Sequence, residues 1–234
     1  MFTRLMFIPL FIFCTTIRLC AQNMPYYDSQ LLHFGFSLGT NLMHFNVSPS
    51  FEPQSDGMIY DVRTSELIPG FTVGGIVDLR LHKNLNLRCT PNLSFGQYSL
   101  SYKETGSVDT DKLFYEVKSL PVSIPFLLKF SADRVGNYRP YIIGGGGMRF
   151  DVGRNKDEKI LLQSTDYFVE FGFGCDTYFA FFKWAPELKF AIGFNDMLVP
   201  MEQRPYFEIN DDKKYTQAID RLLSRMLTLT FHFE

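Results

Sequence analysis

Apolar residues recur at every second position in eight long runs that begin after residue 31. An alternation with a period of two is typical of β-strands whose two faces meet different surroundings. In the first run, Phe34, Phe36 and Leu38 share one face, whereas Ser37 and Gly39 share the other. We therefore predict eight strands, over residues 33–42, 71–81, 85–102, 120–131, 139–152, 167–179, 182–194 and 226–233.

Two of these runs depart from a simple alternation. After Gly96 in the third run, the apolar residues change phase and continue at Tyr98 and Tyr102, which predicts a β-bulge at the glycine. The fourth run contains Pro121 and Pro125, and each proline lacks the N–H that a strand donates to its neighbour. The fourth run is therefore the weakest of the predicted strands.

The connections between the runs alternate in length. Most runs reach or exceed the roughly 9–11 residues that a tilted strand needs to cross a bilayer. Short turns on one rim and long loops on the other are typical of outer-membrane barrels. We predict an all-β fold, an eight-stranded antiparallel transmembrane β-barrel of the OmpA/OmpX type, with both termini on the periplasmic rim. The short connections lie near residues 82–84, 133–138 and 180–181, and the long ones near 48–69, 103–113, 153–165 and 195–218.

Alternation alone does not say which face of the barrel points outward, because a soluble barrel has the same period with its apolar face inside. Two features favour the membrane. The polar face is rich in Gly, Ser, Thr and Asn with charges of both signs, as a narrow filled lumen requires. The apolar face collects aromatic residues toward the strand ends, as interfacial girdles do. These aromatics are Tyr98, Tyr102, Tyr167, Phe179, Phe182, Trp184, Phe231 and Phe233.

The charged residues on the polar face are predicted to point into the lumen. They would form either a path for protons or ions, or a network of ion pairs that fills an interior too narrow for water flow. The two signs are nearly balanced, which favours the network, because unpaired buried charges are costly. The residues are Asp78, Arg80, Arg88, Lys129, Arg149, Asp151, Glu170, Asp176, Lys183, Glu187 and Lys189.

The N-terminus predicts export. Arg4 precedes a short apolar run over residues 5–17, and Ala21 offers a small residue at the expected cleavage site. We predict a signal peptide at 1–21, a periplasmic segment at 22–30 and the barrel at 31–234. The two cysteines that remain, Cys89 and Cys175, fall on the outward faces of the third and sixth strands, which are not neighbours. We expect both to be free thiols.

Little in the sequence predicts chemistry at a site. The net charge of −2 gives no attraction to nucleic acid, and the four histidines lack the spacing of metal ligands. The tract Gly144–Gly147 lies inside a strand and no Lys-Ser/Thr follows it, so it is not a phosphate loop. His44 lies near Ser48, Ser50 and Asp56, but no motif fixes a catalytic geometry. We expect no enzyme activity, no cofactor, no metal and no small-molecule substrate.

The long connection at 195–218 is the strongest candidate for a partner surface. It carries apolar side chains among its charges, and such groups on a loop often mark a contact site. They would alternatively pack back over the mouth of the barrel. The residues are Met197, Leu198, Met201, Tyr206 and Phe207.

Five separate stretches, in order along the predicted barrel, stand out for their sequence. They are Leu-Leu-His-Phe-Gly-Phe-Ser-Leu-Gly at 31–39, Leu-Asn-Leu-Arg to Pro-Asn-Leu-Ser-Phe-Gly over 85–96, Asn-Tyr-Arg-Pro-Tyr at 137–141, Ala-Pro-Glu-Leu-Lys-Phe at 185–190 and Arg-Met-Leu-Thr-Leu-Thr-Phe-His-Phe at 225–233. These stretches resemble the PorT family. One departure is Glu234 after Phe233, where many bacterial barrels end on an aromatic residue.

PorT is an outer-membrane protein of the type IX (Por) secretion and gliding-motility machinery of Bacteroidota. The resemblance implies a non-enzymatic barrel subunit, needed for assembly or operation of protein secretion, whose partners are outer-membrane lipid and other components of that machinery. The family has no known catalytic residues to transfer. Two alternatives stay open from the residues themselves: a generic small porin-like or adhesive barrel, and a lipid-modifying enzyme with its site on the rim.

Overall fold

The computed structural model describes residues 22–50, 60–64, 68–104, 113–153, 163–199 and 219–234, and the predicted signal peptide lies outside this part of the chain. One short 3-10 helix, η1 (Tyr27–Ser29), precedes the strands. No helix among the described residues is long and apolar enough to cross a membrane. The strands are β1 (Leu32–Pro49), β2 (Tyr60–Thr64), β3 (Pro69–Arg80), β4 (Leu85–Cys89), β5 (Asn92–Glu104), β6 (Leu113–Ser119), β7 (Pro121–Ser131), β8 (Tyr138–Asp151), β9 (Thr165–Tyr178), β10 (Lys183–Asp196) and β11 (Ile219–Phe233).

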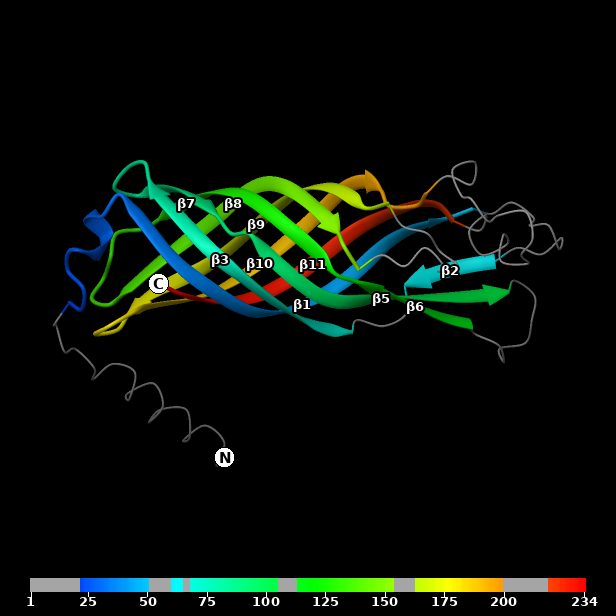
Figure 1. The fold of residues 1–234 in the computed structure, drawn as a ribbon, viewed down its shortest axis with the longest axis horizontal. Helices are drawn as coiled ribbons and strands as arrows, with labels where there is room; N and C mark the ends of the chain where they lie inside the picture. Colours follow the sequence, from blue (N-terminus) through cyan, green and yellow to red (C-terminus); the bar gives the residue numbers. More distant parts are fainter. Residues whose placement is uncertain (1–21, 51–59, 65–67, 105–112, 154–162, 200–218) are drawn as a thin grey trace, which may run out of the picture.

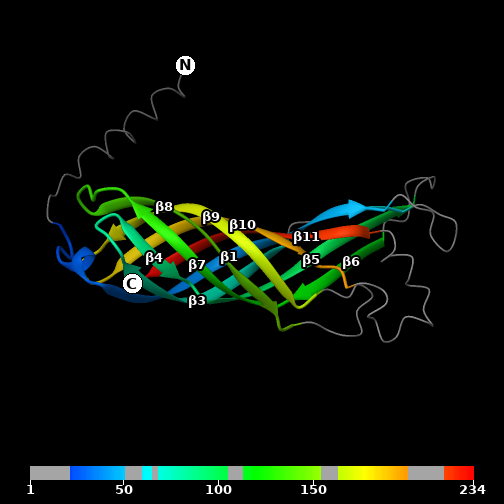
Figure 2. The ribbon, with the colours of Figure 1, turned by 90° about the horizontal axis from the view of Figure 1, so that it is seen from above.

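These strands form a closed antiparallel barrel. Each strand pairs with the next one along the wall, and β1 pairs with both β3 and β11, so the ring has no open side. Three of the eight wall strands are divided in two, as β2 with β3, β4 with β5, and β6 with β7. Figures 1 and 2 show a long cylinder with Glu234 and the segment around η1 at one end, which we call the terminal end. The other is the loop end. The predicted eight-stranded barrel is confirmed.

The wall strands reach further toward the loop end than the alternation predicts. β1 extends to Pro49 and β11 begins at Ile219, whereas the predicted strands end at residue 42 and begin at 226. β2 lies within the predicted loop 48–69 and pairs with β5, so the prediction of a continuous loop there is wrong. The inward residues in these extensions include Met43, Phe45 and Leu222. Apolar residues on the inner face obscure the alternation on which the strand boundaries were based.

The predicted β-bulge at Gly96 is also wrong. Leu93 lies opposite Val122 and Gly96 lies opposite Ser119, so both pairs belong to one unshifted register. Tyr98 therefore points inward, where it is 3% exposed, and does not belong to an outer aromatic girdle. The apolar residues change phase after Gly96 because the inner face becomes apolar, not because the strand slips.

Prolines lie in two of the wall strands, and the barrel stays closed at both. The third wall strand is divided at Pro91, which has no N–H to donate. Pro121 and Pro125 lie within β7, opposite Asp151 and Gly147 of β8, and the ladder continues through both positions. The predicted fourth strand is therefore present from Pro121 to Ser131, and the wall is interrupted at Leu120.

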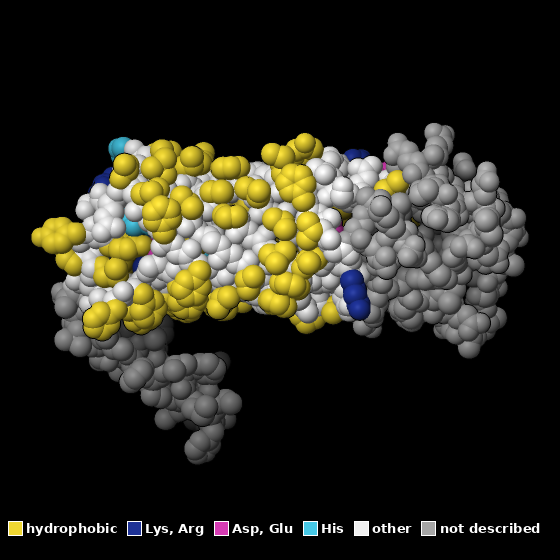
Figure 3. All heavy atoms as spheres, viewed as in Figure 1, with side chains coloured by type: hydrophobic (Ala, Val, Ile, Leu, Met, Phe, Trp, Pro, Cys, Tyr) yellow, Lys and Arg dark blue, Asp and Glu magenta, His cyan; other side chains and the backbone are white. Residues whose placement is uncertain are grey.

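The outer face of the barrel carries a broad apolar band (Figure 3). On β7, Phe126 and Phe130 are 55% and 57% exposed, whereas their neighbours Leu127 and Lys129 are buried. On β9, Phe171 is 53% exposed beside the buried Glu170. Apolar side chains thus point outward and charged side chains point inward, which is the orientation of a membrane barrel.

The two cysteines follow the same rule. Cys89 lies opposite the outward-facing Val77 and Phe126, and Cys175 lies opposite Pro140 of β8. Both thiols are free, as predicted.

Candidate functional site

The terminal half of the lumen is filled by a network of buried charges centred on Arg88. The β3–β4 register places Arg88 opposite Asp78, and the Arg88 Nε donates a hydrogen bond of 2.8 Å to Asp78 Oδ2. The Nη1 and Nη2 groups pair with Glu187 and Glu234 at 3.3 and 3.2 Å. Arg88 is fully buried. One guanidinium thus joins three parts of the ring, because β3, β10 and the residue after β11 each supply a carboxylate.

Lysines complete the network around Arg88. Each is nearly buried and lies beside a carboxylate from another part of the chain, so the barrel is bridged across its width as well as along its wall. The closest pairs are Lys129 with Asp176 at 2.6 Å, Lys183 with Glu234 at 2.7 Å and Lys189 with Glu170 at 2.8 Å.

Glu187 receives the most partners of any carboxylate in this network. Tyr141 donates a hydrogen bond of 2.7 Å to its Oε2, and His232 Nε2 lies 3.0 Å from its Oε1. Lys189 Nζ is 3.7 Å from the same Oε1. The Tyr141 ring also receives the Lys129 ammonium 3.9 Å from its centroid, a cation–π contact. Five carboxylates and four Lys or Arg side chains are therefore held in one continuous cluster.

A second charged group lies nearer the loop end, around Arg149. Its guanidinium is 3.6 Å from Asp166 and donates to the hydroxyls of Ser123 and Ser224. Ser224 in turn donates to Asp166. Arg149 also lies over the ring of Phe168, 4.6 Å from its centroid. This layer joins the charged network below to apolar side chains above.

Those apolar side chains form a buried cluster that fills the loop end of the lumen. Phe45 and Tyr98 stack with their centroids 3.7 Å apart, and Val47 and Leu198 pack against the cluster from its edge. The prediction of a polar inner face along the whole barrel is therefore wrong at this end. The members are Met43, Phe45, Tyr98, Phe168, Ala191, Met197, Ile219, Leu222 and Met226.

Met197 and Leu198 pack back over the mouth, which is the alternative that the sequence left open for this segment. Met197 is 5% exposed and its backbone N–H donates to Leu222 O at 2.8 Å. Neither residue forms an exposed contact surface in this structure. The other three residues of the predicted partner surface, Met201, Tyr206 and Phe207, lie outside the described residues.

The terminal mouth is closed by the segment before β1. Asp28 accepts a hydrogen bond from Tyr178 and lies 3.2 Å from Arg139 and 3.7 Å from Arg134. Tyr27 donates to Glu234 at 3.3 Å, and burial together with the Glu234 carboxylate raises the pKa of the Tyr27 hydroxyl. Residues 22–31 are therefore seated in the mouth, although the sequence predicted only a periplasmic segment over 22–30.

Two residues predicted for the lumen network lie at its edges. Arg80 is half-buried at the terminal mouth, where its Nη1 donates to Ser29 O at 3.0 Å. Asp151 is half-buried at the end of β8, where it accepts hydrogen bonds from Ser119 and from the backbone N–H of Leu120 and Gly153. Asp151 thus stabilises a bend in the wall. The other predicted lumen charges point inward, as described above.

Sequence analysis left three charged residues of the interior out of the predicted lumen network. Asp166 and Glu234 each stand one position from an outward-facing aromatic residue, and the alternation alone would have placed them inside. Arg139 likewise shares the inward phase of Tyr141 in β8. Charged residues near the strand ends were not assigned to the lumen, although the alternation continues to those positions.

Most of the chain matches one family of known proteins. Residues 20–199 match the family model described as outer membrane protein beta-barrel domain, which covers more than half of the chain. The chain belongs to this family. No curated protein matches it. Family membership assigns this outer-membrane barrel to the outer membrane and leaves its specific role open.

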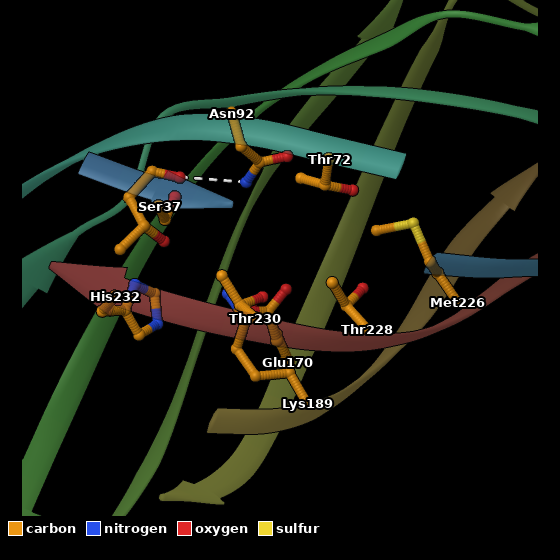
Figure 4. A pocket seen from close by; sticks show the side chains of 10 residues that line it. Ser37, Thr72, Asn92, Glu170, Lys189, Met226, Thr228, Thr230 and His232 are labelled. Atoms are coloured by element: carbon orange, nitrogen blue, oxygen red, sulfur yellow. Dashed lines mark hydrogen bonds and ion pairs between the residues drawn. The ribbon is translucent and has the colours of Figure 1, made fainter. Parts of the chain in front are cut away.

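Two small cavities lie in the lumen of the outer-membrane barrel among the described residues. One of about 10 Å³ lies between Ser37 and Asn92 on one wall and Glu170, Lys189 and His232 on the other (Figure 4). This volume suffices for about one water molecule. A second cavity of the same size lies beside Arg149. Neither has room for a substrate or a passing solute.

The interior of this outer-membrane barrel therefore has the chemistry of a structural plug. Within the described residues, no group of three or more His, Cys, Asp or Glu side chains is arranged to hold a metal ion. His44, the base considered for a rim enzyme, lies on the outer wall opposite Arg225, and Asp56 lies outside the described residues. The arrangement rigidifies the wall and fills the lumen.

Proposed function

We propose that this barrel is a non-enzymatic subunit needed for assembly or operation of the type IX protein secretion machinery, as a scaffold rather than as the conduit. The five stretches that resemble PorT support a role in the type IX secretion machinery. The observation that supports a scaffold is the filled lumen, because the Arg88 network, the Arg149 layer and the apolar cluster occupy successive levels between the two mouths.

A scaffold acts through its surfaces. With the lumen filled, partners of this barrel would contact the outer wall, the short turns or the long loops. We propose that the terminal end faces the periplasm, because short turns on that side and long loops on the other follow the habit of outer-membrane barrels. Other secretion components would then reach the turns and the 22–31 segment from the periplasm.

The secretion proposal is tested by deleting the gene and assaying protease in the culture supernatant. We expect secreted protease activity to fall to the background level, with the activity retained inside the cells, and to return when the wild-type gene is supplied. Normal secretion by the deletion strain would contradict the proposal and leave a generic porin-like or adhesive barrel.

The non-enzymatic assignment has its own test. Lipid A and phospholipid profiles of the deletion strain are compared with those of the parent strain. We expect both profiles to be unchanged, because a barrel that acts only as a scaffold modifies no lipid. A lipid species that disappears on deletion, and returns with the wild-type gene, would support a lipid-modifying enzyme instead.

A further inference from the structure

Two arginines point outward from the wall where the apolar band ends toward the loops. Arg221 and Arg225 lie on β11, four residues apart on the same face, which corresponds to about 13 Å along a strand. The β1–β11 register places His44 opposite Arg225 and Ser48 opposite Arg221. Arg221 is exposed, and Arg225 and His44 are half-buried. These three basic side chains, which we call the basic patch, cover two adjacent strands.

The basic patch lies directly above apolar side chains of the band. On the same face of β11, Leu227 and Leu229 are 38% and 37% exposed. On the neighbouring β10, Phe194 is 55% exposed, and its carbonyl oxygen accepts a hydrogen bond of 3.4 Å from Arg221 Nη2. The edge of the apolar band is the depth at which lipid headgroups meet a membrane protein.

Within the part of the chain that the structure describes, the two guanidinium groups have no carboxylate partner, in contrast to the charges of the lumen. Among the described residues, neither Arg221 nor Arg225 forms an ion pair with a carboxylate. The acid on the facing strand is Asp196, opposite Leu223, and its Oδ1 already accepts the backbone N–H of Leu198 and Leu222. Asp220 is exposed, and among the described residues it forms no ion pair with either arginine.

We propose that Arg221 and Arg225, with His44 beside them, bind the phosphate groups of lipid A in the outer leaflet. A guanidinium matches a phosphate with two parallel hydrogen bonds, and this pairing is stronger where lipid limits the access of water. The acyl chains would lie on Leu227, Leu229 and Phe194. The proposal rests on the orientation proposed above, with the loop end facing outward, and not on the role in secretion.

Binding to the purified barrel tests this proposal. The protein in detergent is titrated with diphosphoryl lipid A, with the same glycolipid lacking its phosphates, and with phosphatidylethanolamine, and bound lipid is counted by native mass spectrometry. We expect diphosphoryl lipid A to bind tighter than either of the others by about tenfold or more. The difference should shrink as salt is raised, because exposed charges are screened.

The matched variants are Arg221→Gln/Arg225→Gln and Lys118→Gln. Lys118 is an exposed cation on β6, four wall strands away around the ring. The double variant should lose the preference for phosphorylated lipid, whereas Lys118→Gln should keep it. Thermal unfolding of both variants should match the wild type, because these side chains lie outside the packed interior.

Two outcomes would overturn the proposal. Equal binding of diphosphoryl lipid A by the wild type and the double variant would remove the basic patch as the site. Tighter binding of phosphatidylethanolamine than of lipid A would contradict the assignment to the outer leaflet. A deletion strain that secretes normally would refute the secretion role alone, since lipid binding is measured on the isolated barrel.

Discussion

At Arg88, a single guanidinium without exposed surface faces the carboxylates of Asp78, Glu187 and Glu234. Buried ion pairs of this kind contribute little when intact, because desolvation offsets their attraction. Removing one partner of such a pair has a larger effect. The remaining charge stays buried without a partner, and this destabilises the folded state.

We predict that Arg88→Met lowers the free energy of unfolding by roughly 3–5 kcal/mol, because three carboxylates would stay buried beside an apolar side chain. Urea unfolding in detergent measures this change. The matched control is Lys83→Met, since Lys83 pairs with Asp133 at 2.9 Å on the surface, with side-chain exposures of 68% and 73%. That pair is solvated, so the control should unfold like the wild type. A stable Arg88→Met barrel would show that the network does not hold the lumen together.

A second prediction for a single residue concerns Phe45 in the apolar cluster. Phe45→Ala should lower the free energy of unfolding by about 3–5 kcal/mol, because Phe45 is 1% exposed and stacks on Tyr98 inside the barrel. Phe126→Ala is the control, since Phe126 points outward and is 55% exposed. Its replacement removes contact with lipid or detergent and opens no cavity. Equal effects of the two substitutions would contradict the inward placement of Phe45.

At the scale of strands, the glycine tract of β8 controls how closely the wall can pack. A Cβ added at Gly145 would overlap the backbone of β7 at Phe126 and Leu127, whereas a Cβ at Gly144 meets only Glu170 O at 3.8 Å. Glycine is therefore needed at alternate positions of the tract, where the neighbouring strand approaches. The requirement concerns packing, not the binding of a phosphate.

We predict that Gly145→Ala lowers the yield of folded barrel and costs roughly 1–3 kcal/mol in stability, because the strands must move apart to admit the methyl group. Gly144→Ala, with open space around its Cβ, should fold with nearly the wild-type yield. The heat-dependent shift of folded barrel on an electrophoresis gel measures the yield. The close approach of β7 and β8 would be refuted if the two variants behaved alike.

The strands and the lumen charges could be predicted from the sequence because both follow one rule. In a narrow barrel, a period of two assigns each residue to lipid or lumen, and Asp78, Arg88 and Glu187 need no further information. The rule does not say how deep a residue lies. Tyr98 was assigned to the outer face because the lumen was assumed polar throughout, and its packing with Phe45 and Met43 of β1, two wall strands away, decides otherwise. The 22–31 segment has no periodicity, so its place in the mouth could not be predicted.

At the scale of the whole molecule, the filled interior predicts that the barrel does not conduct ions. Purified barrel reconstituted in a planar bilayer should conduct no better than the bilayer alone, because the described cavities hold about one water each. Phe45→Ala should conduct little more, since the charged network remains beneath the apolar cluster. Steady conductance by the wild type well above background would contradict a scaffold and favour a pore.

The contact between Tyr27 and Glu234 has a consequence for the order of folding. The segment ahead of the first strand is anchored partly by a residue that follows the last one, so it reaches its seat only after the wall has closed. Its resistance to added protease would thus report completion of the cylinder, and a chain caught with β11 unpaired would be cut there first. In this way residues 22–31, the first described segment, become the final piece to settle.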